Sequence, residues 1–195
     1  GHRPLGLPGR RGADSASLMG AHARAEALGV LAVDLEAMYG LPDPSGAMFV
    51  SHVADDGVLH LSGTVAMVDG APLHPGVVGA GVSIDEAREA ARVACIESLR
   101  VMAFALGSLD RIERMVTLTG YVNSAPDFAD QPRVINAATE LLVGVFGDAG
   151  LCARAAIGCQ GLALDSSVEL VMACRYDGGD VRTALPTPAA ATLPR

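Results

Sequence analysis

One long amphipathic segment, residues 83–106, constrains the fold more than any other part of the sequence. Ser83 and Glu86 have the spacing of a capping box, in which each side chain bonds the backbone N–H of the other residue. Small and apolar residues then recur every three or four positions up to Leu106, and Gly107 follows as a helix stop. A long helix with one apolar face needs a broad surface to pack on, and its small residues favour close packing on a sheet.

The remaining segments predict that sheet. Five apolar runs are typical of strands, at residues 50–53, 58–68, 114–122, 155–157 and 168–174. Further helices are predicted at residues 17–28 and 130–147, with a proline- and glycine-rich connection at residues 38–51. Right-handed crossovers place both long helices on one face of a single mixed sheet, so the predicted class is α+β. The other face would be apolar and bare, which predicts oligomerisation through it.

A chain of 195 residues has room for one domain of common size plus tails. We expect a disordered N-terminal tail over residues 1–16, where glycine, proline and arginine are frequent. A single domain is expected over residues 17–176. Residues 177–195 lack periodicity and are expected to form a loose, disordered tail.

Composition excludes several classes of function. All 14 basic residues are arginine and the net charge is −8, so no basic surface for nucleic acid is expected. We find no apolar run long enough to cross a membrane and no secretory signal, which makes a cytoplasmic location the default. The four cysteines form no C-x-x-C pair and have no histidine at ligand spacing, so we expect neither a metal site nor a cofactor.

Two charged residues occur alone in or beside apolar strands. Arg154 directly precedes the run at residues 155–157, and Glu169 lies inside the run at residues 168–174. A charge left bare in a buried strand is costly, so it is paired, solvated or used. On adjoining strand segments, the two residues would form a clamp for a small anion with a base beside it. The alternatives are a structural salt bridge or two edge-strand residues that face water.

Several motifs together resemble the YjgF/Rid family. They are Leu61-Ser62-Gly63, the helix start Ser83-Ile84-Asp85-Glu86-Ala87, the stretch VTLTGYVNSAPDF at residues 116–128, Phe146-Gly147, Ala153-Arg154 and Val168-Glu169-Leu170. The segments AHARAEALGV (residues 21–30) and SAPDFADQPRVINAATELLVGVFGDAG (residues 124–150) resemble a branch of the family labelled endoribonuclease-like. The resemblance spans about residues 18–176, which is nearly all of the predicted domain.

The resemblance implies a chorismate-mutase-like α+β subunit, a homotrimer, and a cleft at each subunit interface. The best-known members hydrolyse 2-imino or enamine acids to 2-keto acids and ammonia. By this resemblance Arg154 binds the substrate carboxylate and Glu169 positions the attacking water. Ser62 and Gly63 line the cleft, and backbone amides near Ser62 and Cys152 stabilise developing charge. The expected partner is a small carboxylated metabolite.

This sequence departs from the pattern of the imine-hydrolysing members at three places. Phe49 stands nearest to their first-strand tyrosine and lacks its hydroxyl group. Their Ser-Gly-Gln motif ends in Thr64 here. An asparagine of theirs, which follows an aspartate–phenylalanine pair, has no direct counterpart, and either Asn123 or Asn136 could replace it in space. The carboxylate clamp is retained, whereas the polar contacts of the imine are changed.

Three functions are compatible with such a cleft. The first is hydrolysis of a 2-imino or enamine acid, with Arg154 and Glu169 as the catalytic pair. The second is a tautomerase or cyclase step on a carboxylated intermediate of a biosynthetic pathway. The third is binding of a metabolite without catalysis. Ribonuclease activity is the weakest alternative, because the sequence offers no basic patch and no nucleophile–histidine pair. The histidines His52, His60 and His74 are expected near the cleft strands, and only histidine titrates near neutrality without perturbation.

Overall fold

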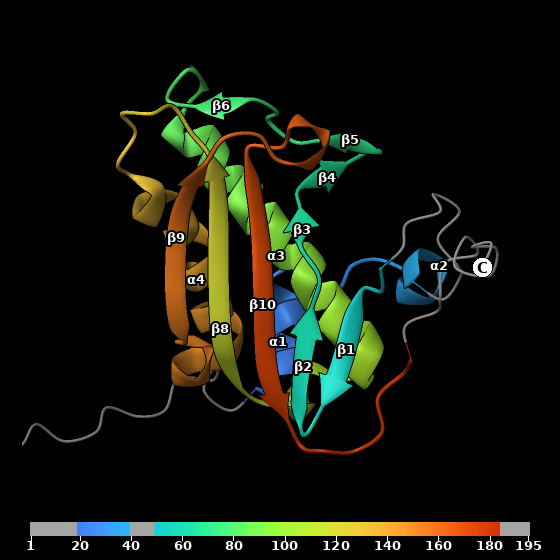
Figure 1. The fold of residues 1–195 in the computed structure, drawn as a ribbon. Coiled ribbons are helices and arrows are strands. Elements are labelled where there is room, and N and C mark those ends of the chain that lie inside the picture. Colours follow the sequence, from blue (N-terminus) through green and yellow to red (C-terminus); the bar gives the residue numbers. More distant parts are fainter. Residues whose placement is uncertain (1–18, 40–48, 184–195) are drawn as a thin grey trace, which may run out of the picture.

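A mixed six-stranded sheet carries the fold in the computed structural model, which describes residues 19–39 and 49–183 (Figure 1). The strand order is β1-β2-β10-β8-β9, and β3 also pairs with β10. Among the described residues of this sheet, only β8 and β9 pair in parallel, because a helix connects them. The bounds are β1 His52–Asp55, β2 Val58–Leu61, β3 Thr64–Val65, β8 Ile112–Asn123, β9 Ala153–Cys159 and β10 Val168–Tyr176.

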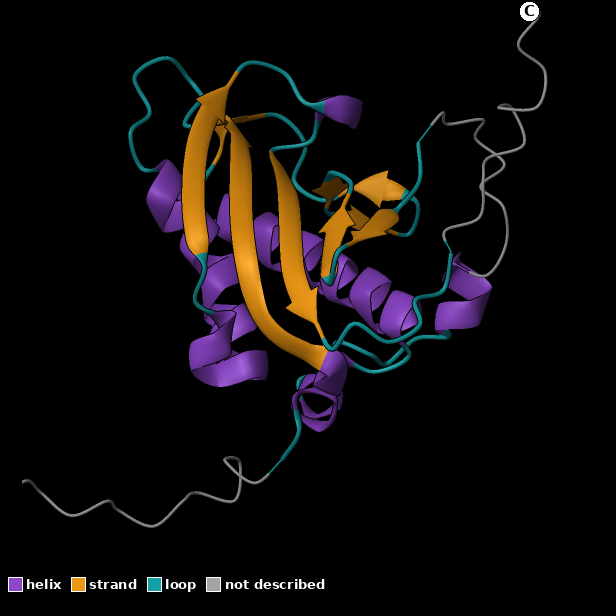
Figure 2. Cartoon of the chain, turned by 60° about the horizontal axis from the view of Figure 1, so that its bottom comes forward, coloured by secondary structure: helices purple, strands orange, loops and turns teal. Residues whose placement is uncertain are grey.

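The long helices α3 (Ile84–Leu106) and α4 (Gln131–Phe146) cover one face of this sheet, as predicted (Figure 2). Ser83 forms the predicted capping box with Glu86, and Gly107 ends α3 in the left-handed conformation. The short helix α1 (Ala21–Ala27) packs against α4, and α2 (Leu35–Tyr39), which was not predicted, lies against α3. No helix of the described ranges combines the length and apolarity that a membrane span requires.

Short elements connect the sheet to α3. The run predicted at residues 58–68 is divided into β2, β3 and β4 (Met67–Val68). It continues through β5 (Ala71–Pro72), β6 (Val77–Val78) and β7 (Gly81–Val82). Single 3-10 turns occupy Leu109–Arg111, Gly147–Gly150 and Ala163–Asp165. The tail predicted at residues 1–16 and residues 40–48 of the predicted connection lie outside the described residues.

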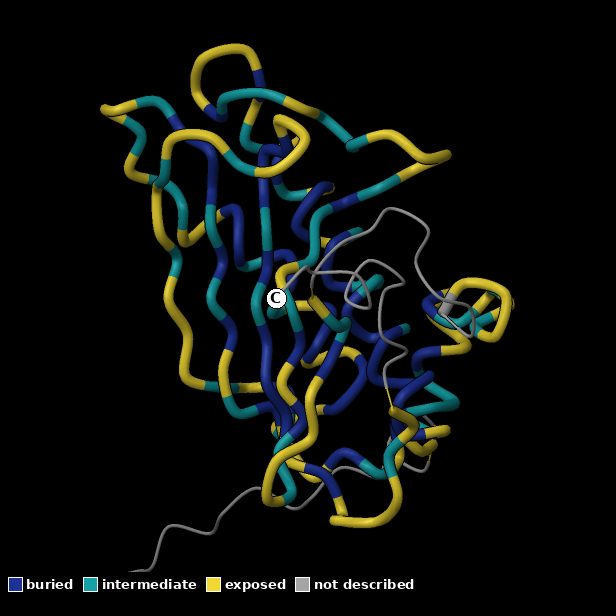
Figure 3. The backbone as a smooth tube through the Cα atoms, turned by 45° about the vertical axis from the view of Figure 1, so that its right-hand side comes forward, coloured by how far each residue is buried: buried dark blue, intermediate teal, exposed yellow. Residues whose placement is uncertain are grey.

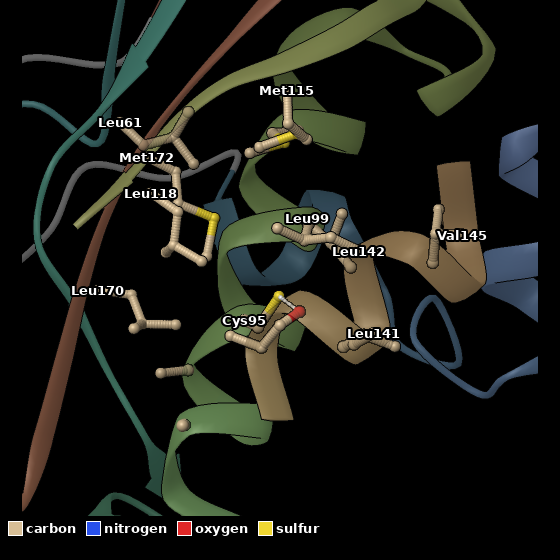
Figure 4. Close-up of a cluster of buried hydrophobic side chains, with 14 of the residues drawn as sticks. Leu61, Cys95, Leu99, Met115, Leu118, Leu141, Leu142, Val145, Leu170 and Met172 are labelled. Atoms are coloured by element: carbon tan, nitrogen blue, oxygen red, sulfur yellow. Dashed lines mark hydrogen bonds between the residues drawn. The ribbon is translucent and has the colours of Figure 1, made fainter. Parts of the chain in front are cut away.

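The core lies between the helices and the sheet. Leu99 of α3, Leu142 of α4 and Leu118 of β8 are fully buried there (Figure 4). The helix α4 approaches β8 so closely that a Cβ atom at Gly120 would lie 2.3 Å from Cδ1 of Ile135. Because dense packing leaves no room for an added atom at this point, the position of α4 against the sheet is closely defined.

No helix within residues 19–39 and 49–183 covers the second face of the sheet (Figure 2). Its residues include Val171, Thr119 and Ala155, which lie side by side on β10, β8 and β9. Much of β9 is exposed, and the side chain of Ile157 is 41% exposed (Figure 3). Exposed apolar area of this kind is typical of protein interfaces. This exposure agrees with the predicted oligomerisation through this face, which stays a prediction.

The segment after β10 differs from the loose tail expected from residue 177. Residues 177–183 have no regular secondary structure, yet they bond to the domain. The backbone N–H of Asp177 donates to the carbonyl of Arg111, and that of Arg182 donates to the carbonyl of Ala105. Nε2 of the buried His52 donates to the carbonyl of Arg182 at 2.7 Å. These long-range bonds hold the segment in place, and residues 184–195 lie outside the described part.

Candidate functional site

Arg154 lies on the edge strand β9, on the side that faces α4. Its register partner Leu118 is fully buried beneath the helices, so both side chains point to the helix side. Nη1 of Arg154 donates to Oδ1 of Asn136 at 2.8 Å and to Oγ1 of Thr139 at 3.0 Å. Asn136 and Thr139 are three residues apart on α4 and therefore share one face of it. Two acceptors on one face of a helix hold the Nη1 end of the guanidinium group in place.

The rest of this guanidinium group has no partner among the described residues. Arg154 is exposed and takes part in none of the ion pairs formed within residues 19–39 and 49–183. Its Nε–H and Nη2 groups donate no hydrogen bond to that part of the chain, and these groups match a carboxylate bidentately. A surface hollow of 410 Å³ lies beside it, lined by Asn136, Thr139, Glu140 and Val143. A structural salt bridge, one of the two alternatives, is therefore absent from the described structure.

Glu169 lies on β10 and points to the uncovered face. Its chain neighbours Val168 and Leu170 are buried on the helix side, and its register partners are Tyr121 on β8 and Val65 on β3. The carboxylate is partly buried and forms neither an ion pair nor a hydrogen bond with the described residues. A partly desolvated carboxylate without a counter-ion suits the role of a base.

Gly63 makes room for this carboxylate. A Cβ atom at position 63 would lie 1.8 Å from Oε1 of Glu169, so any larger residue here would force this carboxylate to move. Ser62 joins the site to the preceding segment, because its hydroxyl donates to the carbonyl of Val50 at 2.6 Å. Phe49, next to Val50, is 63% exposed.

Arg154 and Glu169 do not meet within one subunit. The sequence analysis placed them on adjoining strand segments, but β8 lies between β9 and β10. They also point to opposite faces of the sheet. The structure therefore contains two half-sites. One consists of Arg154 with Asn136 and Thr139, and the other consists of Glu169 with Gly63.

Comparison with known proteins identifies this architecture. Residues 42–174 match the family model described as "YjgF/chorismate mutase-like, putative endoribonuclease". The chain belongs to this family. The mixed sheet with its helices is the chorismate-mutase-like fold of the YjgF proteins, as the resemblance in the sequence implied.

Individual proteins resemble this chain over most of its length. Protein TCP17 of Trypanosoma cruzi is 36% identical over 149 residues, which cover 74% of this chain and 92% of TCP17. The crystal structure of Atu1372 from Agrobacterium tumefaciens, a protein of unknown function, is 32% identical and has a TM-score of 0.69. That match covers 80% of this chain and 94% of Atu1372. The crystal structure of a "putative endoribonuclease" from Shewanella oneidensis shares the fold, with a TM-score of 0.70 at 23% identity; the match covers 81% of this chain and 100% of that one.

The sequence left two candidates, Asn123 and Asn136, for the residue that replaces the asparagine of the YjgF pattern in space. Asn123 is buried, its Nδ2 donates to the carbonyl of Gly76, and its Oδ1 accepts from the N–H of Gly161. Asn123 thus ties two loops to the end of β8. Asn136 is the asparagine that contacts Arg154.

The cysteines of this YjgF chain are held as neutral thiols. Cys152, predicted near the substrate, is partly buried and packs against the core. Burial raises the pKa of its thiol, against the opposing influence of Arg154 and Arg114. Burial also raises the pKa of Cys159, and the charge of Glu169 adds to the effect. A thiol with a raised pKa is a poor nucleophile at neutral pH.

The three histidines expected near the cleft form no hydrogen bond with Arg154 or Glu169 within the described residues. Both ring nitrogens of His52 are hydrogen-bonded, one to Ser51 and one to the carbonyl of Arg182. His74 bonds Glu89 at 2.8 Å at the start of α3. His60 is exposed on β2, on the uncovered face of the sheet, opposite Ala173. None of the three contacts Arg154 or Glu169 among the hydrogen bonds of the described residues.

Proposed function

We propose that this protein is a YjgF/Rid-type enzyme that hydrolyses a 2-imino or enamine acid to a 2-keto acid and ammonia. The observation that carries the proposal is the guanidinium group of Arg154. Two bonds from α4 orient it, and its remaining N–H groups have no partner among the described residues. A guanidinium group in this state is prepared to bind a small carboxylate in one orientation.

The complete site would form between two subunits. Since Arg154 and Glu169 lie on opposite faces of one sheet, a substrate that contacts both needs Arg154 from one copy and Glu169 from the next. A homotrimer with one cleft at each interface supplies this arrangement, and the apolar uncovered face provides a contact surface. In this assembly Gly63 and Ser62 belong to the same half of the cleft as Glu169.

The reaction then needs only modest chemistry. Arg154 binds the substrate carboxylate and so places the adjacent C=N carbon over the second half-site. Glu169 accepts a proton from a water molecule as the water oxygen bonds to that carbon, and the imine nitrogen takes up a proton. In the resulting tetrahedral intermediate, Glu169 returns its proton to the nitrogen and the C–N bond breaks, so that ammonia leaves with the bonding electron pair. The hydroxyl group loses its proton to solvent as the keto C=O bond forms, which balances the proton that the imine nitrogen took from solvent. The N–H of Ser62 itself donates to the carbonyl of Ser51, so stabilisation of developing charge would fall to neighbouring backbone N–H groups and to those near Cys152.

A tautomerase or cyclase step on a carboxylated intermediate is the second candidate. The observation that favours it is the exposed ring of Phe49, which lies next to the Ser62 contact and offers area without a hydroxyl donor. Such a surface suits a larger and less polar substrate. Binding of a metabolite without turnover would use the same Arg154 contact. Cleavage of RNA is disfavoured by a net charge of −8.

The decisive experiment measures keto-acid formation from 2-aminoacrylate and 2-iminobutyrate, each generated in situ. Wild type is compared with Arg154→Ala, Glu169→Gln and the control Arg133→Ala, which removes only an exposed ion pair with Asp130. We expect acceleration by wild type and the control, none by Arg154→Ala, and a strong reduction in Glu169→Gln. If the folded oligomer does not accelerate the reaction, imine hydrolysis is excluded. Thermal stabilisation by small carboxylates would then identify a binding protein.

A further inference from the structure

A second pocket lies where the parallel strands β8 and β9 end and α4 begins. It has a volume of 440 Å³ and is lined by Ser124, Ala125, Pro126, Phe128, Gln131, Gly158, Cys159 and Gln160. In strand–helix–strand units, the carboxyl ends of parallel strands are the usual place for a ligand. On the same strand, Gly158 follows Arg154 by four residues, which is about 13 Å along an extended chain. The pocket is therefore separate from the proposed carboxylate contact.

Within the described residues, the side-chain amide of Gln131 is hydrogen-bonded through its NH₂ group but not through its carbonyl oxygen. Its Nε2 donates to the carbonyl of Phe128 at 2.7 Å and to Oγ of Ser124 at 3.4 Å. Its Oε1 accepts no hydrogen bond from any described residue. Since the NH₂ group is committed to the protein, the amide presents a fixed acceptor to the pocket.

Ser124 supplies the complementary donor. It is only 6% exposed, and its backbone N–H donates to the carbonyl of Cys159 at 3.1 Å. Its Oγ accepts the bond from Gln131, but within the described residues the hydroxyl proton has no acceptor. A buried donor without an acceptor is unfavourable, and a ligand carbonyl would satisfy it.

Gly158 keeps both groups accessible. A Cβ atom at this position would lie 2.6 Å from Nε2 of Gln131 and 3.0 Å from Oγ of Ser124. Any other residue would push the amide and the hydroxyl out of their present positions. The absence of a side chain at this position of β9 thus leaves the space in which the two polar groups lie.

The lining carries no charged side chain. Cys159 is the only titratable residue in it, and burial together with the charge of Glu169 raises the pKa of its thiol, so it stays neutral. The nearby Arg133 is paired with Asp130. A charged ligand would find no counter-ion on this lining, and the negative charge of Glu169, which reaches Cys159, disfavours a carboxylate.

We propose that this pocket binds a primary carboxamide with a short apolar substituent. The N–H group of the ligand donates to Oε1 of Gln131, and its carbonyl accepts from the hydroxyl of Ser124. The substituent extends into an adjoining hollow of 310 Å³, which shares Ser124 with the pocket and includes the side chains of Val77 and Ala80. One amide group of the ligand thereby forms hydrogen bonds with both the unpaired acceptor of Gln131 and the unpaired donor of Ser124.

Butyramide and butyrate test the proposal, because they have nearly the same shape and differ in charge. Backbone amide shifts of the full-length oligomer are followed by NMR while each compound is added. Butyramide should shift Ser124, Gln131, Gly158 and Gln160, whereas butyrate should shift only residues beside Arg154. Gly158→Ala should weaken butyramide binding about tenfold or more, since both hydrogen bonds are disturbed. Gly144→Ala is the matched control, because its added methyl meets only an ordinary contact at 3.6 Å.

Ser124→Ala provides a second variant that removes the donor with little change in volume. If butyramide shifts no residue of the pocket, or if butyrate shifts the same residues equally, the proposal is wrong. Unchanged butyramide affinity in a folded Gly158→Ala and in Ser124→Ala would also overturn it. The outcome is independent of imine hydrolysis, which these variants leave to Arg154 and Glu169.

Discussion

Arg154 and Glu169 project from opposite faces of the same sheet, with β8 between their strands. The two residues therefore belong to different clefts if they act in an oligomer. A site that uses both residues must therefore be shared by two subunits and cannot lie within one.

Mixing two inactive variants should restore activity. When Arg154→Ala and Glu169→Gln are unfolded together and refolded at equal amounts, about one quarter of the clefts combine an intact arginine with an intact glutamate. We expect that fraction of wild-type keto-acid formation. Refolding each variant alone is the control. If the mixture is as inactive as its components, the two residues do not act in a shared cleft.

Replacing Gly63 by alanine should act on catalysis through Glu169. The φ angle of Gly63 is outside the left-handed region, so the backbone accepts alanine, but its Cβ would lie 1.8 Å from Oε1 of Glu169. The carboxylate must move, and we expect kcat to fall toward that of Glu169→Gln while KM changes little. Steady-state kinetics check this, with Gly144→Ala as the control for an added methyl group. A Gly63→Ala enzyme with wild-type kcat would contradict the role assigned to this carboxylate.

Lysine should not replace Arg154. An ammonium group cannot bond Asn136 and Thr139 and also hold a carboxylate through two parallel bonds. Loss of one charge-assisted hydrogen bond corresponds to about a 10- to 100-fold reduction in kcat/KM. The measurement is kcat/KM of Arg154→Lys, beside Arg133→Lys on the adjacent surface. Equal values for Arg154→Lys and wild type would show that only the positive charge is needed.

The segment after β10 should make stability depend on acid pH. The hydrogen bonds from Arg111 and from the N–H of Gly179 lower the pKa of Asp177 from 3.8 to about 2. A group with a lowered folded-state pKa stabilises the fold above its unfolded pKa and loses this effect as the pH falls through the folded value. The Tm difference between wild type and Asp177→Asn should thus be full above about pH 4 and vanish near pH 2.

Thermal unfolding followed by circular dichroism at several pH values tests this dependence. Asp69→Asn is the control, since Asp69 is exposed and forms no ion pair within the described residues. The same pH profile in both variants would mean that the contact between Arg111 and Asp177 does not stabilise the folded state.

Local sequence patterns predicted those structural features that depend on residues close together in the chain, such as the ends of the helices. The capping box of Ser83 and Glu86 and the stop at Gly107 define α3, because caps are formed by residues three or four positions apart. The alternation of helices and strands predicted the mixed sheet with both long helices on one face.

Other features depended on contacts between residues far apart in the chain. The strand order placed β8 between Arg154 and Glu169, and the sequence contains no signal for that order. The choice between Asn123 and Asn136, and the anchoring of residues 177–183 by Arg111 and Ala105, likewise required the packed structure. By itself, the sequence determined the long helices, the main strands, their order along the chain and the family, because these follow from local pattern and residue type. Only the tertiary structure decided which side of the sheet each residue faces and which groups stay unpaired, because burial and hydrogen bonding are set by the whole packed chain.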